Sequence, residues 1–213
     1  STACALQADG TVRCWGRGAR GALGNGALRP QHTPRRVRFD ATPEPAEPEA
    51  RGPPLDPCVD PREPSPRQPN IVGLATGEGH NCVVVSDGTL RCWGDNGSHQ
   101  LGADAEGTVP VLAPVPVSRL RSAVQVAVGD AASCAVMRDG TVSCWGSNDY
   151  GRLSTAAVSS QWTPGRWPGG GYRQVAIIAG LTCARGRDGG VTCMGGPAHP
   201  FAPFSLALPG RAA

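Results

Sequence analysis

The fold of this chain is decided by the stretch SCAVMRDGTVSCWG at residues 133–146. Close copies begin at Cys4, Cys82 and Cys183, and each places Asp five, Gly six and a second Cys ten residues after the first Cys. Self-similarity at a fixed spacing is the signature of a repeat architecture. We therefore interpret the chain as four copies of one unit.

The residue pattern of each unit predicts a β-hairpin. Asp139 and Gly140 lie between two runs rich in Val and Thr, which is a strong signal for a tight turn. A three-residue loop, 138–140 with a left-handed glycine, sets Cys134 directly opposite Cys144 in a non-hydrogen-bonded pair, and a two-residue loop does not. The α-carbons of such a pair lie about 4.5 Å apart, within the range of a disulfide. The sequence therefore predicts the disulfides Cys4–Cys14, Cys82–Cys92, Cys134–Cys144 and Cys183–Cys193.

Two other interpretations of the cysteines compete with this one. Cysteines ten apart also occur in helical hairpins, but Asp-Gly and β-branched residues inside every interval argue against a helix. Structural zinc is the second alternative, yet the chain has no Cys-x-x-Cys pair and its four histidines keep no common spacing to the cysteines. We expect no metal site and no cofactor.

Composition limits the class of protein. The chain of 213 residues contains Gly 30, Pro 21 and Phe 3, which is typical of a loop-rich β protein. All 20 basic residues are Arg, which excludes Schiff-base chemistry on Lys. A net charge of +3 is too small to indicate nucleic acid or a membrane surface as partner. No apolar run approaches the roughly 20 residues of a membrane span, so we expect no membrane insertion.

Cysteine usage predicts the compartment. Eight of the nine cysteines fall in evenly spaced pairs, which favours an oxidising environment: secreted, periplasmic or cell-surface. The ninth, Cys58, is expected to be a free thiol. The residues from Ser1 to Cys4 already belong to a hairpin, so no signal peptide is visible, and the chain can be a processed protein or a fragment.

The chain divides into five predicted segments. Residues 1–39 form a first repeat without its upstream strand, and 40–70 form a Pro- and acid-rich insertion that we expect to be disordered. Residues 71–122 and 123–172 form the second and third repeats. Residues 173–213 form a fourth, degraded repeat and a closing strand, with Met194 where the other copies have Trp. Strands are expected at 34–39, 71–77, 109–117, 124–129, 175–180 and 204–210.

The second repeat resembles the regulator of chromosome condensation repeat, in the disulfide-containing form found in bacterial secreted and surface proteins. The matching residues are Gly77, His80, Cys82, Asp87, Gly88, Thr89, Cys92, Trp93, Gly94, Asn96, Gln100, Leu101 and Gly102. The resemblance implies an all-β propeller, of which this chain supplies about four blades of short antiparallel strands. Either the C-terminal strand completes the first blade of a small ring, or the chain is an arc of a larger propeller. We favour the arc.

No catalytic motif is present, so the sequence favours a non-enzymatic module that binds a protein or a glycan through its blade loops. We expect His80 to be a hydrogen-bonded structural residue. The alternatives are an accessory or substrate-binding part of a larger secreted enzyme or enzyme inhibitor, and a non-functional repeat remnant. Additional blades, supplied by a part of the protein outside this sequence or by another copy of the chain, are a second class of partner. Candidate binding residues, for which packing between blades is the competing role, are Asp95, Asn96, His99, Asn148, Tyr150, Arg152, Trp162, Trp167 and Tyr172.

Overall fold

The computed structural model describes residues 2–39, 69–103, 109–154, 160–178, 180–197 and 199–206, without the side chains of 199–201. These residues form four antiparallel sheets that follow one another along the chain. We call each sheet with its loops a blade.

The first blade has three strands in the order β1-β2-β3, and the other three blades have four strands each. The strands of the first and second blades are β1 (Thr2–Leu6), β2 (Val12–Gly16), β3 (Gln31–Arg36), β4 (Ile71–Thr76), β5 (His80–Val85), β6 (Leu90–Gly94) and β7 (Val111–Pro116). Those of the third and fourth are β8 (Ala123–Val128), β9 (Ala132–Met137), β10 (Val142–Ser147), β11 (Ser160–Arg166), β12 (Tyr172–Ile178), β13 (Leu181–Gly186), β14 (Val191–Gly195) and β15 (His199–Leu206). Two short 3-10 turns, η1 (Ala19–Gly21) and η2 (Asp149–Gly151), lie in loops.

The hairpin register confirms the predicted loop. The N–H of Met137 donates to the carbonyl of Thr141 at 2.8 Å, and Gly140 has a φ of 83°. Cys134 then lies opposite Cys144, and the other three pairs repeat this register. The α-carbons of the four pairs are 4.0 to 4.1 Å apart, and all four predicted disulfides are present.

The turn aspartates hold these hairpins closed. Oδ1 of Asp139 accepts hydrogen bonds from the backbone N–H of Thr141 at 2.9 Å and from its hydroxyl at 2.7 Å. These bonds stabilise the carboxylate and lower the pKa of Asp139 below its ordinary value. Asp9 and Asp87 repeat the arrangement. In the fourth blade Gly190 replaces the Thr, so Asp188 accepts from the turn's backbone N–H without an accompanying hydroxyl.

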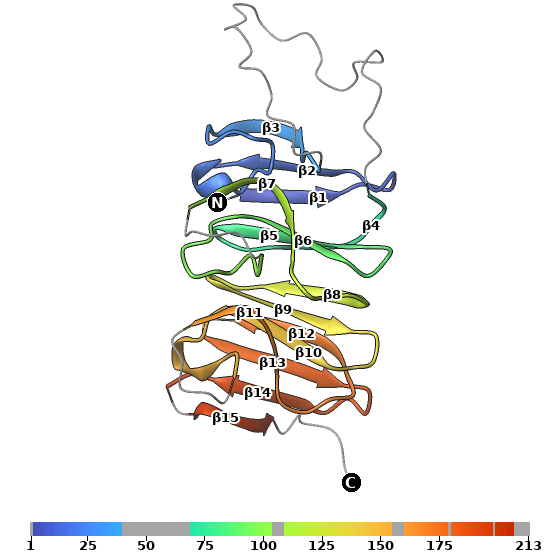
Figure 1. The fold of residues 1–213 in the computed structure, drawn as a ribbon, viewed down its shortest axis with the longest axis vertical. Coiled ribbons are helices and arrows are strands. Elements are labelled where there is room, and N and C mark those ends of the chain that lie inside the picture. Colours follow the sequence, from blue (N-terminus) through green and yellow to red (C-terminus); the bar gives the residue numbers. More distant parts are fainter. Residues whose placement is uncertain are drawn as a thin grey trace, which may run out of the picture.

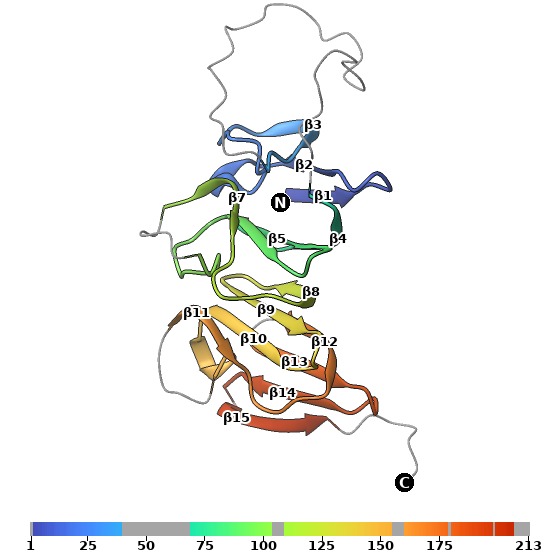
Figure 2. The ribbon, with the colours of Figure 1, turned by 45° about the vertical axis from the view of Figure 1, so that its right-hand side comes forward.

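The blades are stacked in sequence order (Figure 1). Apolar side chains fill the space between consecutive sheets. Strands β5 and β9 each have a blade on both sides, and all their residues are buried. The equivalent strand β13 is only partly buried, with Arg185 exposed. Both ribbon views place the first and fourth blades at opposite ends of the molecule (Figure 2). The four blades therefore form an open arc.

Several strands differ from their predicted ranges. Strand β3 ends at Arg36, because Val37 turns into the core and Phe39 packs edge-on against Trp93 at a centroid distance of 6.2 Å. The C-terminal strand β15 pairs with β14, so it is the outer strand of the fourth blade and does not complete the first. The predictions for Cys58, for residues 40–68 and for 207–210 lie outside the described residues.

Candidate functional site

The tryptophans that follow the second cysteine join neighbouring blades. Nε1 of Trp93 donates to the carbonyl of Ala22 at 3.1 Å, and Nε1 of Trp145 donates to that of Gln100 at 2.8 Å. Ala22 and Gln100 hold the same position in the loops of the preceding blades. A Cβ on Gly102 would lie 2.7 Å from the Trp145 ring, so the indole fits only against glycine. These fully buried tryptophans are packing residues.

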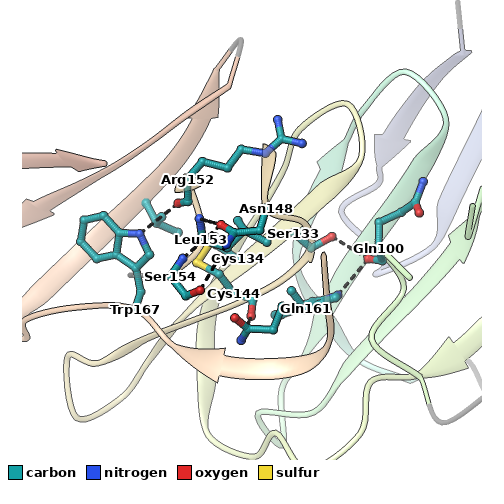
Figure 3. The surroundings of a disulfide bond; sticks show 12 residues. Gln100, Ser133, Cys134, Cys144, Asn148, Arg152, Leu153, Ser154, Gln161 and Trp167 are labelled. Atoms are coloured by element: carbon teal, nitrogen blue, oxygen red, sulfur yellow. Dashed lines mark hydrogen bonds between the residues drawn. A yellow bond between two sulfur atoms is a disulfide. The ribbon is translucent and has the colours of Figure 1, made fainter. Parts of the chain in front are cut away.

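At the fourth blade this hydrogen bond between blades is replaced by one within the third blade. Met194 takes the place of the tryptophan and is buried. The loop carbonyl that it faces, that of Arg152, is instead bonded by Nε1 of Trp167 at 3.2 Å (Figure 3). Trp167 stands where the first two blades have Val37 and Val117, as the shared backbone bonds to the second strand show. Trp167 thus stands where other blades have Val, and Met194 stands where they have Trp. Trp167 therefore compensates for the tryptophan that the fourth repeat lacks.

His80 is a structural residue within the blade interface, as expected. It is fully buried, and its Nε2 lies 2.8 Å from Oγ of Ser133. Ser133 uses its own hydroxyl hydrogen to bond the carbonyl of Gln100 at 2.9 Å, so Nε2 of His80 must be the donor. Its Nδ1 then carries a buried lone pair with no partner among the described residues. Burial in this site lowers the pKa of His80 to about 3.

Five of the nine candidate binding residues lie buried and support the loops or the core. Oδ1 of Asn148 accepts the backbone N–H of Leu153 at 2.7 Å, and Asn96 bonds that of Leu101 in the same way. Nε of Arg152 donates to the carbonyl of Ser147 at 3.0 Å. The two remaining members, Trp167 and Tyr172, pack edge-on with ring centroids 5.5 Å apart. These five side chains have no surface to present to a partner, because an adjacent blade or loop covers them.

The other four candidates lie at the end of the blades where the loops β6–β7 and β10–β11 emerge. The ring of His99 stacks on Trp162, with centroids 4.3 Å apart and an interplanar angle of 19°. Trp162 remains 62% exposed, and Tyr150 is 57% exposed. Asp95 forms an ion pair with Arg20, in which Oδ2 of Asp95 lies 2.8 Å from Nη1 of Arg20. We call the half-buried His99 and the exposed Trp162 together the aromatic platform.

Each contact at this end joins two consecutive blades. The pair Arg20–Asp95 links the first blade to the second, and the aromatic platform links the second to the third. Tyr150 lies against Gly180 of the fourth blade, where a Cβ would stand 3.3 Å from Cδ2 of the tyrosine. The loops therefore form a continuous row along the arc, fixed in place by the disulfide-bonded hairpins.

His99 adopts a left-handed backbone conformation, as do four other described non-glycine residues. Its φ is 59°, and the equivalent positions of the first and third blades are Gly21 and Gly151, with φ of 73° and 67°. A non-glycine residue in the left-handed region is uncommon and costs free energy. This strained backbone places the imidazole flat on Trp162.

Sequence reasoning missed one residue of this row, Arg20. A usable signal existed, because Arg20 and Tyr150 both stand four residues after the glycine that ends the Cys-Trp-Gly motif. Both residues have φ values near those of left-handed glycine, 64° and 60°. The repeat thus projects a non-glycine side chain from the same loop position in two blades.

The described residues offer little for chemistry. They contain no group of three or more His, Cys, Asp or Glu side chains that could hold a metal ion. A cavity of about 430 Å³ opens at the turn end of the fourth blade, where Arg187 and Asp188 lie among several glycines. None of the described helices is long and apolar enough to cross a membrane.

Comparison with known proteins identifies the class of this fold. Two family models, both described as regulator of chromosome condensation (RCC1) repeat, match residues 71–100 and 123–152, and 9–43 and 87–136. The chain belongs to the RCC1-repeat family, whose scaffold is the β-propeller. The human E3 ubiquitin-protein ligase HERC2 is 30% identical over 154 residues, which cover 70% of this chain and 3% of that protein.

Solved structures agree on the fold. Human WBSCR16 superposes with a TM-score of 0.77 at 18% identity and covers 98% of this chain and 51% of its own. Prp20p from Saccharomyces cerevisiae, whose structure was described together with its binding to Gsp1p and histones, gives a TM-score of 0.70 at 18% identity and 98% and 49% coverage. The chain therefore spans about half of each of these propellers and a small part of the ligase.

Proposed function

We propose that this chain is a non-enzymatic, extracellular propeller segment that binds a protein partner through its row of blade loops, with the aromatic platform at the centre. The observation that carries the proposal is the strained, left-handed His99, which holds its ring against an exposed Trp162. Strain of this kind clusters at functional sites, and exposed aromatic residues are the usual anchors of protein interfaces.

Three further observations support the proposal. Ordered disulfides in every blade suit an oxidising, extracellular compartment. Contacts between consecutive blades hold the described residues of the row, which reduces the conformational entropy that they lose on binding. Prp20p, a propeller of the same fold, binds Gsp1p and histones, which are proteins.

The test compares binding by the intact chain and two single variants. Trp162→Ala removes the exposed ring, and Val72→Ala, 57% exposed on β4 away from the platform, serves as the control. Partners are captured from the extracellular fraction of the producing cells and identified by mass spectrometry, and a glycan array is run in parallel. We expect a protein that is retained by the wild type and by Val72→Ala but lost with Trp162→Ala.

Three outcomes contradict this proposal. If Trp162→Ala retains the same proteins as the wild type, the platform is not the binding site. If the platform-dependent ligand is a glycan and no protein depends on Trp162, the partner class is wrong. Retention of the chain inside the cell with all thiols reduced would contradict the extracellular assignment.

A second candidate is an accessory part of a larger secreted enzyme or enzyme inhibitor. It is favoured by the fact that the chain matches only 3% of HERC2, a much longer protein. The sequence that adjoins this segment in its full reading frame distinguishes the two, because an accessory part requires a catalytic domain next to it.

A further inference from the structure

The first blade carries most of the positive charge of the described residues. Residues 2–39 contain seven arginines and one acidic residue, a net formal charge of +6. The described parts of the second and third blades each balance to zero, and that of the fourth carries +2. The net charge of +3 for the whole chain conceals this concentration at one end of the arc.

Two of these arginines face each other on paired strands. Arg13 of β2 lies directly opposite Arg36 of β3, so the two side chains are neighbours on one side of the sheet. The equivalent pairs in the other blades are Arg91 with Pro116, Ser143 with Arg166, and Thr192 with Ser205. Like charges directly opposite each other destabilise a sheet. Only the first blade has this cross-strand pair of like charges.

Among the described residues no carboxylate forms a salt bridge with this pair, and Asp9 attracts Arg36 only from a longer distance. Nε of Arg13 donates to the amide oxygen of Gln7 at 2.7 Å, and Nε of Arg36 is buried without a hydrogen bond among the described residues. Asp9, the one acidic residue of the described first blade, is engaged by both donors of Thr11 in the hairpin turn. Arg35, next along β3, is exposed, but side chains alternate along a strand, so it points to the opposite side of the sheet. We call Arg13 and Arg36 the arginine edge.

We propose that the arginine edge is a docking surface for an acidic segment of a protein partner, distinct from the row of loops. Guanidinium groups bind carboxylates through paired, charge-assisted hydrogen bonds, and an anion between Arg13 and Arg36 removes their repulsion. Strand β3 is the outermost strand of its sheet, so an extended acidic segment can lie along it.

Several features favour carboxylates over nucleic acid. Single-stranded nucleic acid needs exposed aromatic rings on which bases stack. In the described part of the first blade Trp15 and Phe39 are both half-buried. Duplex binding needs a basic surface that follows many phosphates, and here the charge is confined to one blade of the arc.

The test measures binding of a short oligoglutamate peptide to the full chain by calorimetry at low ionic strength. The variant Arg13→Gln with Arg36→Gln removes the cross-strand pair. The matched control, Arg91→Gln with Arg166→Gln, removes two arginines from the equivalent strand positions of the second and third blades. Both variants lose the same formal charge, so only the location differs. A DNA oligonucleotide of equal charge is titrated in parallel.

We expect the first variant to bind oligoglutamate at least about tenfold more weakly, and the control to bind within about twofold of the wild type. Equal weakening in both variants would show a response to net charge alone and would overturn the proposal. So would an absence of oligoglutamate binding to the wild type, or tighter binding of the oligonucleotide that depends on the same two arginines. Circular dichroism of both variants confirms that the sheets are intact.

Discussion

His80 should make this protein lose stability as the pH falls through the range just below neutrality. In the unfolded chain a histidine titrates near pH 6.5, whereas burial lowers the pKa of His80 to about 3 in the folded protein. Between these values the unfolded chain binds a proton that the folded protein does not. The stability is therefore fully present above about pH 6.5 and declines as the pH falls toward 3.

The size of the effect follows from the two pKa values. A single group of this kind lowers the free energy of unfolding by about 2 kcal/mol between pH 7 and pH 5. The cause lies in the contacts of the ring. Nε2 already donates to Ser133, so a second proton must go to Nδ1, which is buried without an acceptor among the described residues. Asp9, Asp87 and Asp139 do not titrate in this window, because the pKa of each lies below the ordinary value of 3.8.

The assay is unfolding in guanidinium chloride, followed by tryptophan fluorescence under non-reducing conditions at pH 7, 6 and 5. His80→Gln removes the titrating group, and His32→Gln, an exposed histidine on β3, is the control. We expect the decrease in unfolding free energy between pH 7 and pH 5 to be about 2 kcal/mol smaller in His80→Gln than in the wild type and the control. If His80→Gln also packs less well and is less stable at pH 7, the comparison still holds, because it uses only the change in unfolding free energy between pH 7 and pH 5. Identical pH dependence in all three proteins would refute the reasoning.

Three other predictions concern the hairpins and the blade interfaces. Trp167→Val should destabilise the protein by about 3 kcal/mol, and adding Met194→Trp should recover part of that loss; a double-mutant cycle with no favourable coupling would contradict the exchange of roles. Thr141→Val removes a donor to Asp139, so carboxylate titration by NMR should show a higher pKa for that aspartate than in the wild type, and an unchanged value would count against the turn geometry. Non-reducing peptide mapping should find the four bridges within hairpins and a free thiol at Cys58; bridges between repeats would contradict the predicted register.

Features that depend on neighbouring residues were predictable from the sequence. The Asp-Gly turn and the ten-residue spacing of the cysteines set the loop length, the register and the four disulfides, because these contacts form within one hairpin. The repeat also predicted about four blades of antiparallel strands. The end of β3 was not predictable, because Val37 leaves the strand to enter a core that the second blade completes.

In the candidate site, too, some properties of single residues were predictable from the sequence and others depended on the tertiary structure. The loop residues could be listed from the sequence, but whether each faces solvent or core could not be decided. Trp167 and Trp162 are five residues apart and both lie outside the repeat pattern, yet one is fully buried and the other is 62% exposed. Trp167 is buried where it bonds the loop carbonyl that Met194 leaves unbonded, whereas Trp162 has one face covered by His99 from another blade and stays largely exposed.

The sequence by itself therefore determined the hairpins, their disulfides and the family of the fold. Only the tertiary structure decided which side chains meet across blades: His80 with Ser133, Trp93 with Ala22, and the aromatic platform. The physical reason is the sequence distance over which each interaction acts. A hairpin closes through residues at most ten apart, whereas the blade contacts join residues that are 53 and 71 positions apart and meet only after the sheets have stacked.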